Sequence, residues 1–213
     1  MDLVIFTSLL HAAIFAIAVL GAAIFWITPA YRGICLLLAL ISLSALFNLL
    51  EDLQISRSFY LVSPIFILGV GPAFYFAVRR LIVGPCGYRA YWHFLPMLLA
   101  LPFTAHPQAV IAVGTVWRIA YALLTLRLIV QFNRYLTAQR SDAREVSLVW
   151  LAGLVGASAI FSAADLLRLN FQLELGQPLN TLGYAVSTSV SFIILFLLVL
   201  ILTNRRAGLE TLA

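Results

Sequence analysis

The sequence predicts an all-α, polytopic membrane protein with seven transmembrane helices, its N-terminus outside and its C-terminus in the cytoplasm. Hydrophobic residues make up 63% of the chain and charged residues only 10%, whereas soluble domains are about one-quarter charged. Apolar runs near the ~20 residues that a helix needs to cross a bilayer recur along the chain. We therefore expect a single transmembrane domain over residues 1–213.

The first three expected helices are continuous apolar runs at Leu3–Ile27, Gly33–Leu50 and Phe59–Val78. The first begins directly after Asp2 and is too long for the apolar part of a cleavable signal peptide, so we expect it to remain as a span. The third closes on the pair Arg79–Arg80, which would anchor its end among the lipid headgroups.

The fourth expected helix, Ala90–Ala105, is the weakest of the seven. It is short, and it carries Pro96 and Pro102, which cannot donate a backbone hydrogen bond. A chain without this helix would have six spans, and the sequence leaves that alternative open.

The last three expected helices are Pro107–Val130, Val146–Leu169 and Leu179–Thr203. Asp142, with Glu145 three residues later, is a capping signal for the helix that follows it. The outer loop 170–180 contains the glycine and proline of a turn. Because the loops are short, we expect consecutive helices to be antiparallel neighbours.

Arginine placement sets the orientation of the bundle. One set of helix ends carries nine arginines: Arg32, Arg79, Arg80, Arg89, Arg134, Arg140, Arg144, Arg205 and Arg206. The opposite ends carry only Arg57 and Arg168. Since positively charged loops stay in the cytoplasm, the first set marks the cytoplasmic side of a bacterial inner membrane.

Several chemistries lack the residues that they need. The chain has no lysine for a retinal Schiff base. His11, His93 and His106 fall on both sides of the membrane, so they cannot meet at one metal ion. Ser158 has no later histidine to activate it as a protease nucleophile. We expect no enzyme activity, no cofactor and no metal, and no direct binding of nucleic acid, because the positive charge is dispersed over short loops.

Polar residues gather in the outer half of the expected helices. Such residues are costly at membrane depth and usually face a cavity or a partner. They recur every three or four residues, so each set lines one helix face. If these faces converge, they form a ligand-binding pocket lined by His11, Asn48, Glu51, Arg118, Tyr121, Ser162, Asp165 and Tyr184.

Within this pocket, Arg118 and Asp165 are the expected ion pair, and Arg118 would hold an anionic head group. Glu51 would gate the mouth or favour cations. A structural interpretation stands beside this one, because hydroxyl groups in membrane helices often bond their own backbone and an ion pair can simply hold helices together. Small residues at 152, 153, 156 and 157 are interpreted as close helix packing.

Gly71 and Pro72 interrupt the third expected helix. Pro72 removes one backbone hydrogen bond, and Gly71 lets a neighbouring backbone approach closely. The pair predicts a bend, which would act either as a hinge between the outer pocket and the cytoplasmic end or as a static kink.

Two short motifs carry a resemblance to a known family. The run "GPAFYFAVRRLI" supplies Gly71, Pro72, Phe74, Tyr75 and Arg79, and the run "YWHFLP" supplies His93, Phe94, Leu95 and Pro96. Together with the seven-span layout, they resemble the N-terminal membrane domain of bacterial AraC-type transcription regulators. That resemblance implies a sensor whose state is read by a cytoplasmic helix-turn-helix domain. The present chain departs from the family pattern in ending at Ala213, before such a domain.

These observations predict a membrane-embedded sensory domain. It would bind a small amphipathic or anionic ligand from the periplasmic side and signal to a cytoplasmic output, with membrane lipid as its surroundings. The main alternative is a small-solute transporter or permease, and a membrane enzyme acting on lipid ranks last. The ligand and the oligomeric state, including a homodimer, stay open.

Overall fold

The computed structural model describes residues 3–56, 61–139 and 147–210, and this part of the chain is helical with no strand. Six of its helices are long and apolar enough to cross a membrane. They are α1 (Leu3–Trp26), α2 (Arg32–Asp52), α3 (Ile65–Val83), α5 (Pro107–Gln139), α7 (Val149–Asn170) and α8 (Gln172–Glu210). The prediction of an all-α, polytopic membrane protein is therefore confirmed. The capping signal at Asp142 and Glu145 lies outside the described residues.

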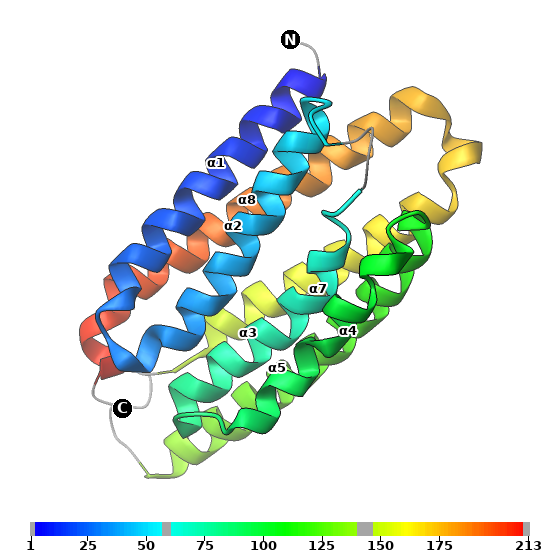
Figure 1. The fold of residues 1–213 in the computed structure, drawn as a ribbon. Helices are drawn as coiled ribbons and strands as arrows, with labels where there is room; N and C mark the ends of the chain where they lie inside the picture. Colours follow the sequence, from blue (N-terminus) through cyan, green and yellow to red (C-terminus); the bar gives the residue numbers. More distant parts are fainter. Residues whose placement is uncertain (1–2, 57–60, 140–146, 211–213) are drawn as a thin grey trace.

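Each long helix packs against its neighbours along the chain, and α8 returns to α1, so the six helices form a closed ring (Figure 1). The start of α1 and the end of α8 lie at opposite ends of the bundle. The described arginines of the cytoplasmic set lie at the end where α8 finishes. We name this the inner end and the opposite one the outer end.

The prediction of one continuous fourth helix is wrong. The chain instead makes a 3₁₀-helix, η2 (Tyr88–Phe94), a short α4 (Leu95–Leu99) and a second 3₁₀-helix, η3 (Leu101–Phe103). Pro96 and Pro102 each stand in the first turn of a new short helix, where their missing N–H costs nothing.

These pieces still cross the bundle, because they run antiparallel along α3. The ring of His93 packs on Phe76 with centroids 5.2 Å apart, the Met97 sulfur lies beside Gly69, and Ala100 belongs to the same buried cluster as Ile65. The chain therefore returns to the outer end before α5 begins (Figure 1). In the described part of the chain, six long helices and this one broken segment therefore run between the two ends of the bundle.

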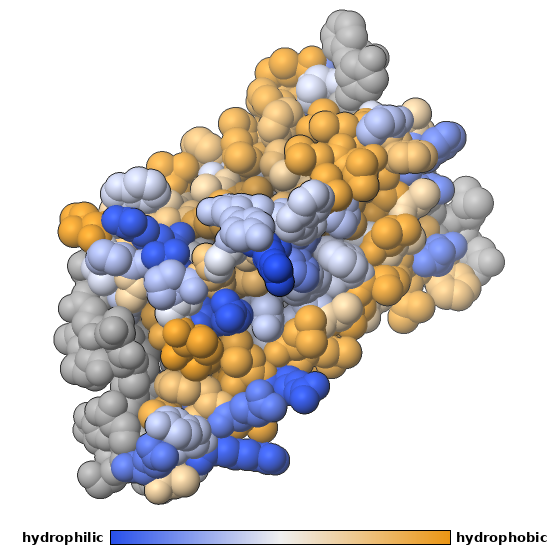
Figure 2. Space-filling model, turned by 60° about the horizontal axis from the view of Figure 1, so that its bottom comes forward, coloured by the Kyte–Doolittle hydropathy of each residue, from blue (hydrophilic) through white to orange (hydrophobic). Residues whose placement is uncertain are grey.

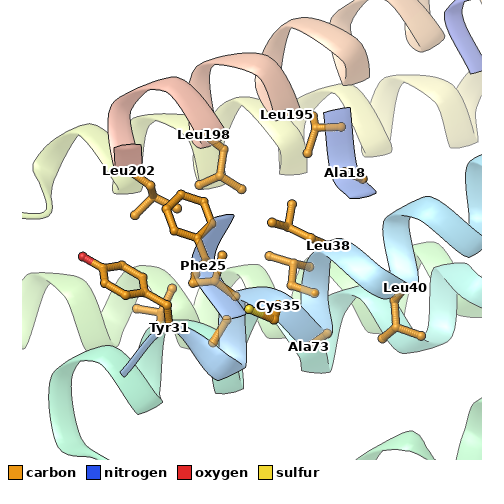
Figure 3. Packing of buried hydrophobic residues seen from close by; sticks show 14 of the residues in the cluster. Ala18, Phe25, Tyr31, Cys35, Leu38, Leu40, Ala73, Leu195, Leu198 and Leu202 are labelled. Carbon is orange, nitrogen blue, oxygen red and sulfur yellow. The ribbon is translucent and has the colours of Figure 1, made fainter. Parts of the chain in front are cut away.

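The core is concentrated toward the inner end. Figure 3 shows Phe25, Tyr31, Leu198 and Leu202 packed together there, and all four are at most 2% exposed. By contrast, α7 has buried side chains only in its first two turns. Large apolar residues elsewhere face outward, as a lipid-facing surface requires, and tight van der Waals packing holds the interior together.

Close backbone contacts occur at other glycines than the sequence indicates. A Cβ on Gly153 or Gly156 would meet nothing within 4 Å, so the expected close packing there is wrong. A Cβ on Gly33 would lie 2.8 Å from the Cα of Ala77, where α2 crosses α3. The predicted turn in the outer loop is a local break at Gly176, whose φ of 71° lies in the left-handed region that favours glycine.

Candidate functional site

At the outer end, His11 joins three helices. Its Nε2 lies 2.9 Å from the Tyr184 hydroxyl and 3.8 Å from Oδ2 of Asp52, and it is 5% exposed. Ser8 donates to the same Asp52 oxygen at 3.4 Å. The prediction therefore brings His11 and Tyr184 together correctly, but it omits Asp52, which is the last residue of α2 and one turn beyond Asn48.

Glu51 has a different role from the expected gate. One carboxylate oxygen accepts the backbone N–H groups of Val62 and Ser63 at 2.8 and 2.9 Å, and the other accepts the Ser63 hydroxyl at 2.6 Å. Glu51 is 7% exposed. Its charge thus satisfies backbone donors that lead into α3, a position where a helix favours an anion. Asn48 is half-buried and makes no side-chain hydrogen bond to a described residue.

The expected ion pair between Arg118 and Asp165 is wrong. Asp165 pairs with Arg168, three residues later on α7, at 2.8 Å. Arg168 also donates to the Asn180 side chain and thereby ties α7 to α8. A partner one helical turn away needs less reach than a partner on another helix, so the local pair forms.

Arg118 instead reaches across to Ser158. Its Nη2 donates to the Ser158 hydroxyl at 2.7 Å, which links α5 to α7. A small cavity of about 30 Å³ adjoins this contact, and it is lined by residues of α3, α5 and α7, among them Gly71, Phe74 and Thr125. That volume has room for about two water molecules. Among the described residues, no carboxylate lies within ion-pair distance of Arg118, and Asp165, which is paired with Arg168, acts on the Arg118 charge only from farther away.

The other two predicted pocket residues do not line this cavity. The Tyr121 hydroxyl bonds His93 of η2, and its ring packs against Trp117. The Ser162 hydroxyl donates to the Ser158 carbonyl at 2.7 Å, as the structural interpretation of the hydroxyl groups expects. Ser158, which shares a polar α7 face with Ser162 and Asp165 in the sequence pattern, is the member of that face that lines the cavity.

The predicted hinge contacts the Arg118 cavity directly. A Cβ on Gly71 would stand 3.0 Å from the Cα of Arg118 and 3.4 Å from the Cβ of Tyr121, so only glycine allows α3 to approach α5 this closely. Helix α3 continues through Pro72 without a break. The missing N–H of Pro72 nevertheless leaves the carbonyl of Leu68 without its usual helical donor.

The predicted single pocket is therefore two separate groups. One contains His11, Asp52 and Tyr184 at the outer end, and the other contains Arg118, Ser158 and the cavity between α3, α5 and α7.

Comparisons with protein-family models, curated proteins and solved structures find no match for this chain. The resemblance to AraC-type regulators stays a prediction, and the geometry of these two groups carries the functional argument.

Proposed function

We propose that this protein is a non-enzymatic sensory domain of the bacterial inner membrane, in which Arg118 binds the anionic head group of a small amphipathic ligand. The observation that carries the proposal is the incomplete pairing of Arg118. An arginine near the middle of a membrane helix costs about 2.5–3.5 kcal/mol or more, and a hydrogen bond to a charged group returns about 1.5–3 kcal/mol. One serine hydroxyl supplies no negative charge, whereas a carboxylate or phosphate would neutralise the guanidinium and engage its remaining donors.

The size of the cavity suggests how binding would be detected. A space of about 30 Å³ accepts a group no larger than a carboxylate, so a larger head group would have to displace a wall. Gly71 forms part of that wall, and the next residue, Pro72, weakens α3 there. Displacement of α3 would move its last turn, which carries Arg80 to the inner end. The output would be read by a cytoplasmic partner or domain.

The packing favours a sensor over a transporter. A transport path must reach both membrane faces, whereas the inner half of this bundle is filled by fully buried residues such as Tyr31, Leu148 and Leu202. The half-buried polar side chains of α7, by contrast, lie beyond its buried first turns, toward the outer end.

The proposal is tested by the thermal stability of the purified protein with decanoate and with decanol, which share a tail and differ in head-group charge. We expect decanoate to raise the melting temperature of the native protein and of Arg127→Ala, an exposed arginine on the same helix. It should not raise that of Arg118→Ala. Equal stabilisation of Arg118→Ala, or equal stabilisation by decanol, would show that Arg118 binds no anionic head group.

A further inference from the structure

A second cavity lies at the inner end, between the last turns of α3 and the 3₁₀-helix η2. Its volume is about 340 Å³, within the range of about 300–1,000 Å³ that is usual for small-molecule sites. Its lining includes Phe76, Arg79, Cys86, Tyr88, Arg89 and His93. None of these residues lines the Arg118 cavity, so the two sites are distinct.

The lining of this second cavity is basic. Two guanidinium groups and one imidazole contribute to it, and no carboxylate does. Arg79 is half-buried and donates from Nη1 to the Cys86 sulfur at 3.0 Å, which leaves its other N–H groups for a ligand. Arg89, in η2, is exposed and also lines the cavity. Two arginines facing one hollow match the several acceptor oxygens of a phosphate group.

The surroundings of the cavity place it at the depth of lipid headgroups. Tyr88, Tyr91 and Trp92 of η2 are 73%, 72% and 67% exposed, and aromatic residues of this kind concentrate at membrane–water interfaces. Figure 2, in which the inner end comes forward, shows hydrophilic side chains gathered there beside apolar surface. An anion bound between Arg79 and Arg89 would therefore lie where the headgroups of the cytoplasmic leaflet lie.

We propose that this cavity binds the phosphate group of an anionic phospholipid from the cytoplasmic leaflet. Arg79 and Arg89 hold the phosphate oxygens from two sides. The Tyr88 ring covers the headgroup from the rim, and the acyl chains remain in the surrounding bilayer. Free phosphate presents the same oxygens, but it gains nothing from the exposed aromatic residues of η2.

The experiment compares lipid retention and thermal stability of the purified protein. Phosphatidylglycerol, phosphatidylcholine and inorganic phosphate are each added to the native protein, Arg79→Gln, Arg89→Gln and Arg134→Gln. Arg134 is the matched control, because it is an exposed arginine near the inner end of α5 that does not line the cavity. Arg89→Gln keeps the test valid if Arg79→Gln fails to fold, since Arg89 is exposed.

We expect phosphatidylglycerol, but not phosphatidylcholine, to be retained and to raise the melting temperature by about 3 °C. Retention should fall about tenfold in Arg79→Gln and Arg89→Gln and stay unchanged in Arg134→Gln, because a charged hydrogen bond is lost only in the first two. An equal effect of inorganic phosphate would support the phosphate site and assign it to a soluble anion. Equal retention of both lipids, or an equal loss in Arg134→Gln, would overturn the proposal.

Discussion

Glu51 is a charged side chain that stabilises backbone rather than binding a ligand. It accepts three hydrogen bonds at 2.6–2.9 Å while only 7% exposed. Sequence position alone suggests a gate, since Glu51 stands at the mouth of the expected pocket. Only in the folded chain do residues 62 and 63 come close enough to donate hydrogen bonds to Glu51.

We predict that Glu51→Ala destabilises the protein by about 2–5 kcal/mol, because it leaves buried donors of Val62 and Ser63 without an acceptor. Glu51→Gln should cost less, since its amide oxygen still accepts one pair of these bonds. The measurement is the free energy of unfolding in mixed detergent micelles. Equal, small losses in both variants would show that Glu51 does not support the start of α3.

The contact between His11 and Tyr184, at 2.9 Å, links α1 directly to α8 at the outer end. We predict a coupling energy of about 0.6–1 kcal/mol between His11→Phe and Tyr184→Phe, the usual size of a hydrogen bond between membrane helices. A double-mutant cycle of unfolding free energies measures it. Additive losses would mean that the two side chains do not stabilise one another.

Helix α3 has close backbone contacts with two neighbours, with α2 at Gly33 and with α5 at Gly71. Gly71 faces α5 so closely that a methyl group would press on the Arg118 backbone, while the glycines of α7 face open space. In the sequence, α3 and α7 are both apolar runs that contain glycine, so the sequence alone does not distinguish how closely each helix packs. The difference arises from which neighbour lies opposite each glycine.

We predict that Gly71→Ala destabilises the bundle by about 1–3 kcal/mol, because α3 and α5 must separate to admit the methyl group. Gly156→Ala is the matched control on α7. It should be neutral or stabilising by up to about 1 kcal/mol, since alanine favours a helix and nothing lies within 4 Å. The measurement is thermal unfolding of the two variants. A similar loss of stability in both would contradict the close contact at Gly71.

The broken fourth crossing shows what proline does to an otherwise apolar run. The apolar content of residues 90–105 predicts a span, and the chain does traverse the bundle there. Pro96 and Pro102 prevent one continuous helix, so packing against α3 carries this segment across instead.

For the molecule as a whole, the arrangement predicts an odd number of crossings. Alkaline phosphatase fused after Ala105 should be active, because the broken segment returns the chain to the outer side. Fusions after Gly87 and Gln139 should be inactive, since phosphatase folds only outside the cytoplasm and the arginine-rich end faces inward. An inactive Ala105 fusion would mean that the broken segment stays on the inner side.

The candidate site could be predicted from the sequence only in part. Helical spacing correctly selects Arg118, His11 and Tyr184 as polar residues of the interior. It does not select their partners, because Ser158 and Asp52 become neighbours only through the rotation and depth of separate helices. Opposite charge favours a pair of Arg118 with Asp165, but Arg168 lies one turn from Asp165 on the same helix and forms the pair instead.

By itself, the sequence determined the class of this protein, its apolar helices and the distribution of its arginines, because hydropathy and charge act residue by residue against the bilayer. Tertiary structure alone decided which polar groups meet, where α3 touches α5, and that two distinct cavities adjoin Arg118 and Arg79. Those features depend on distances of a few ångströms between helices that are far apart in the chain, and a one-dimensional pattern does not specify such distances.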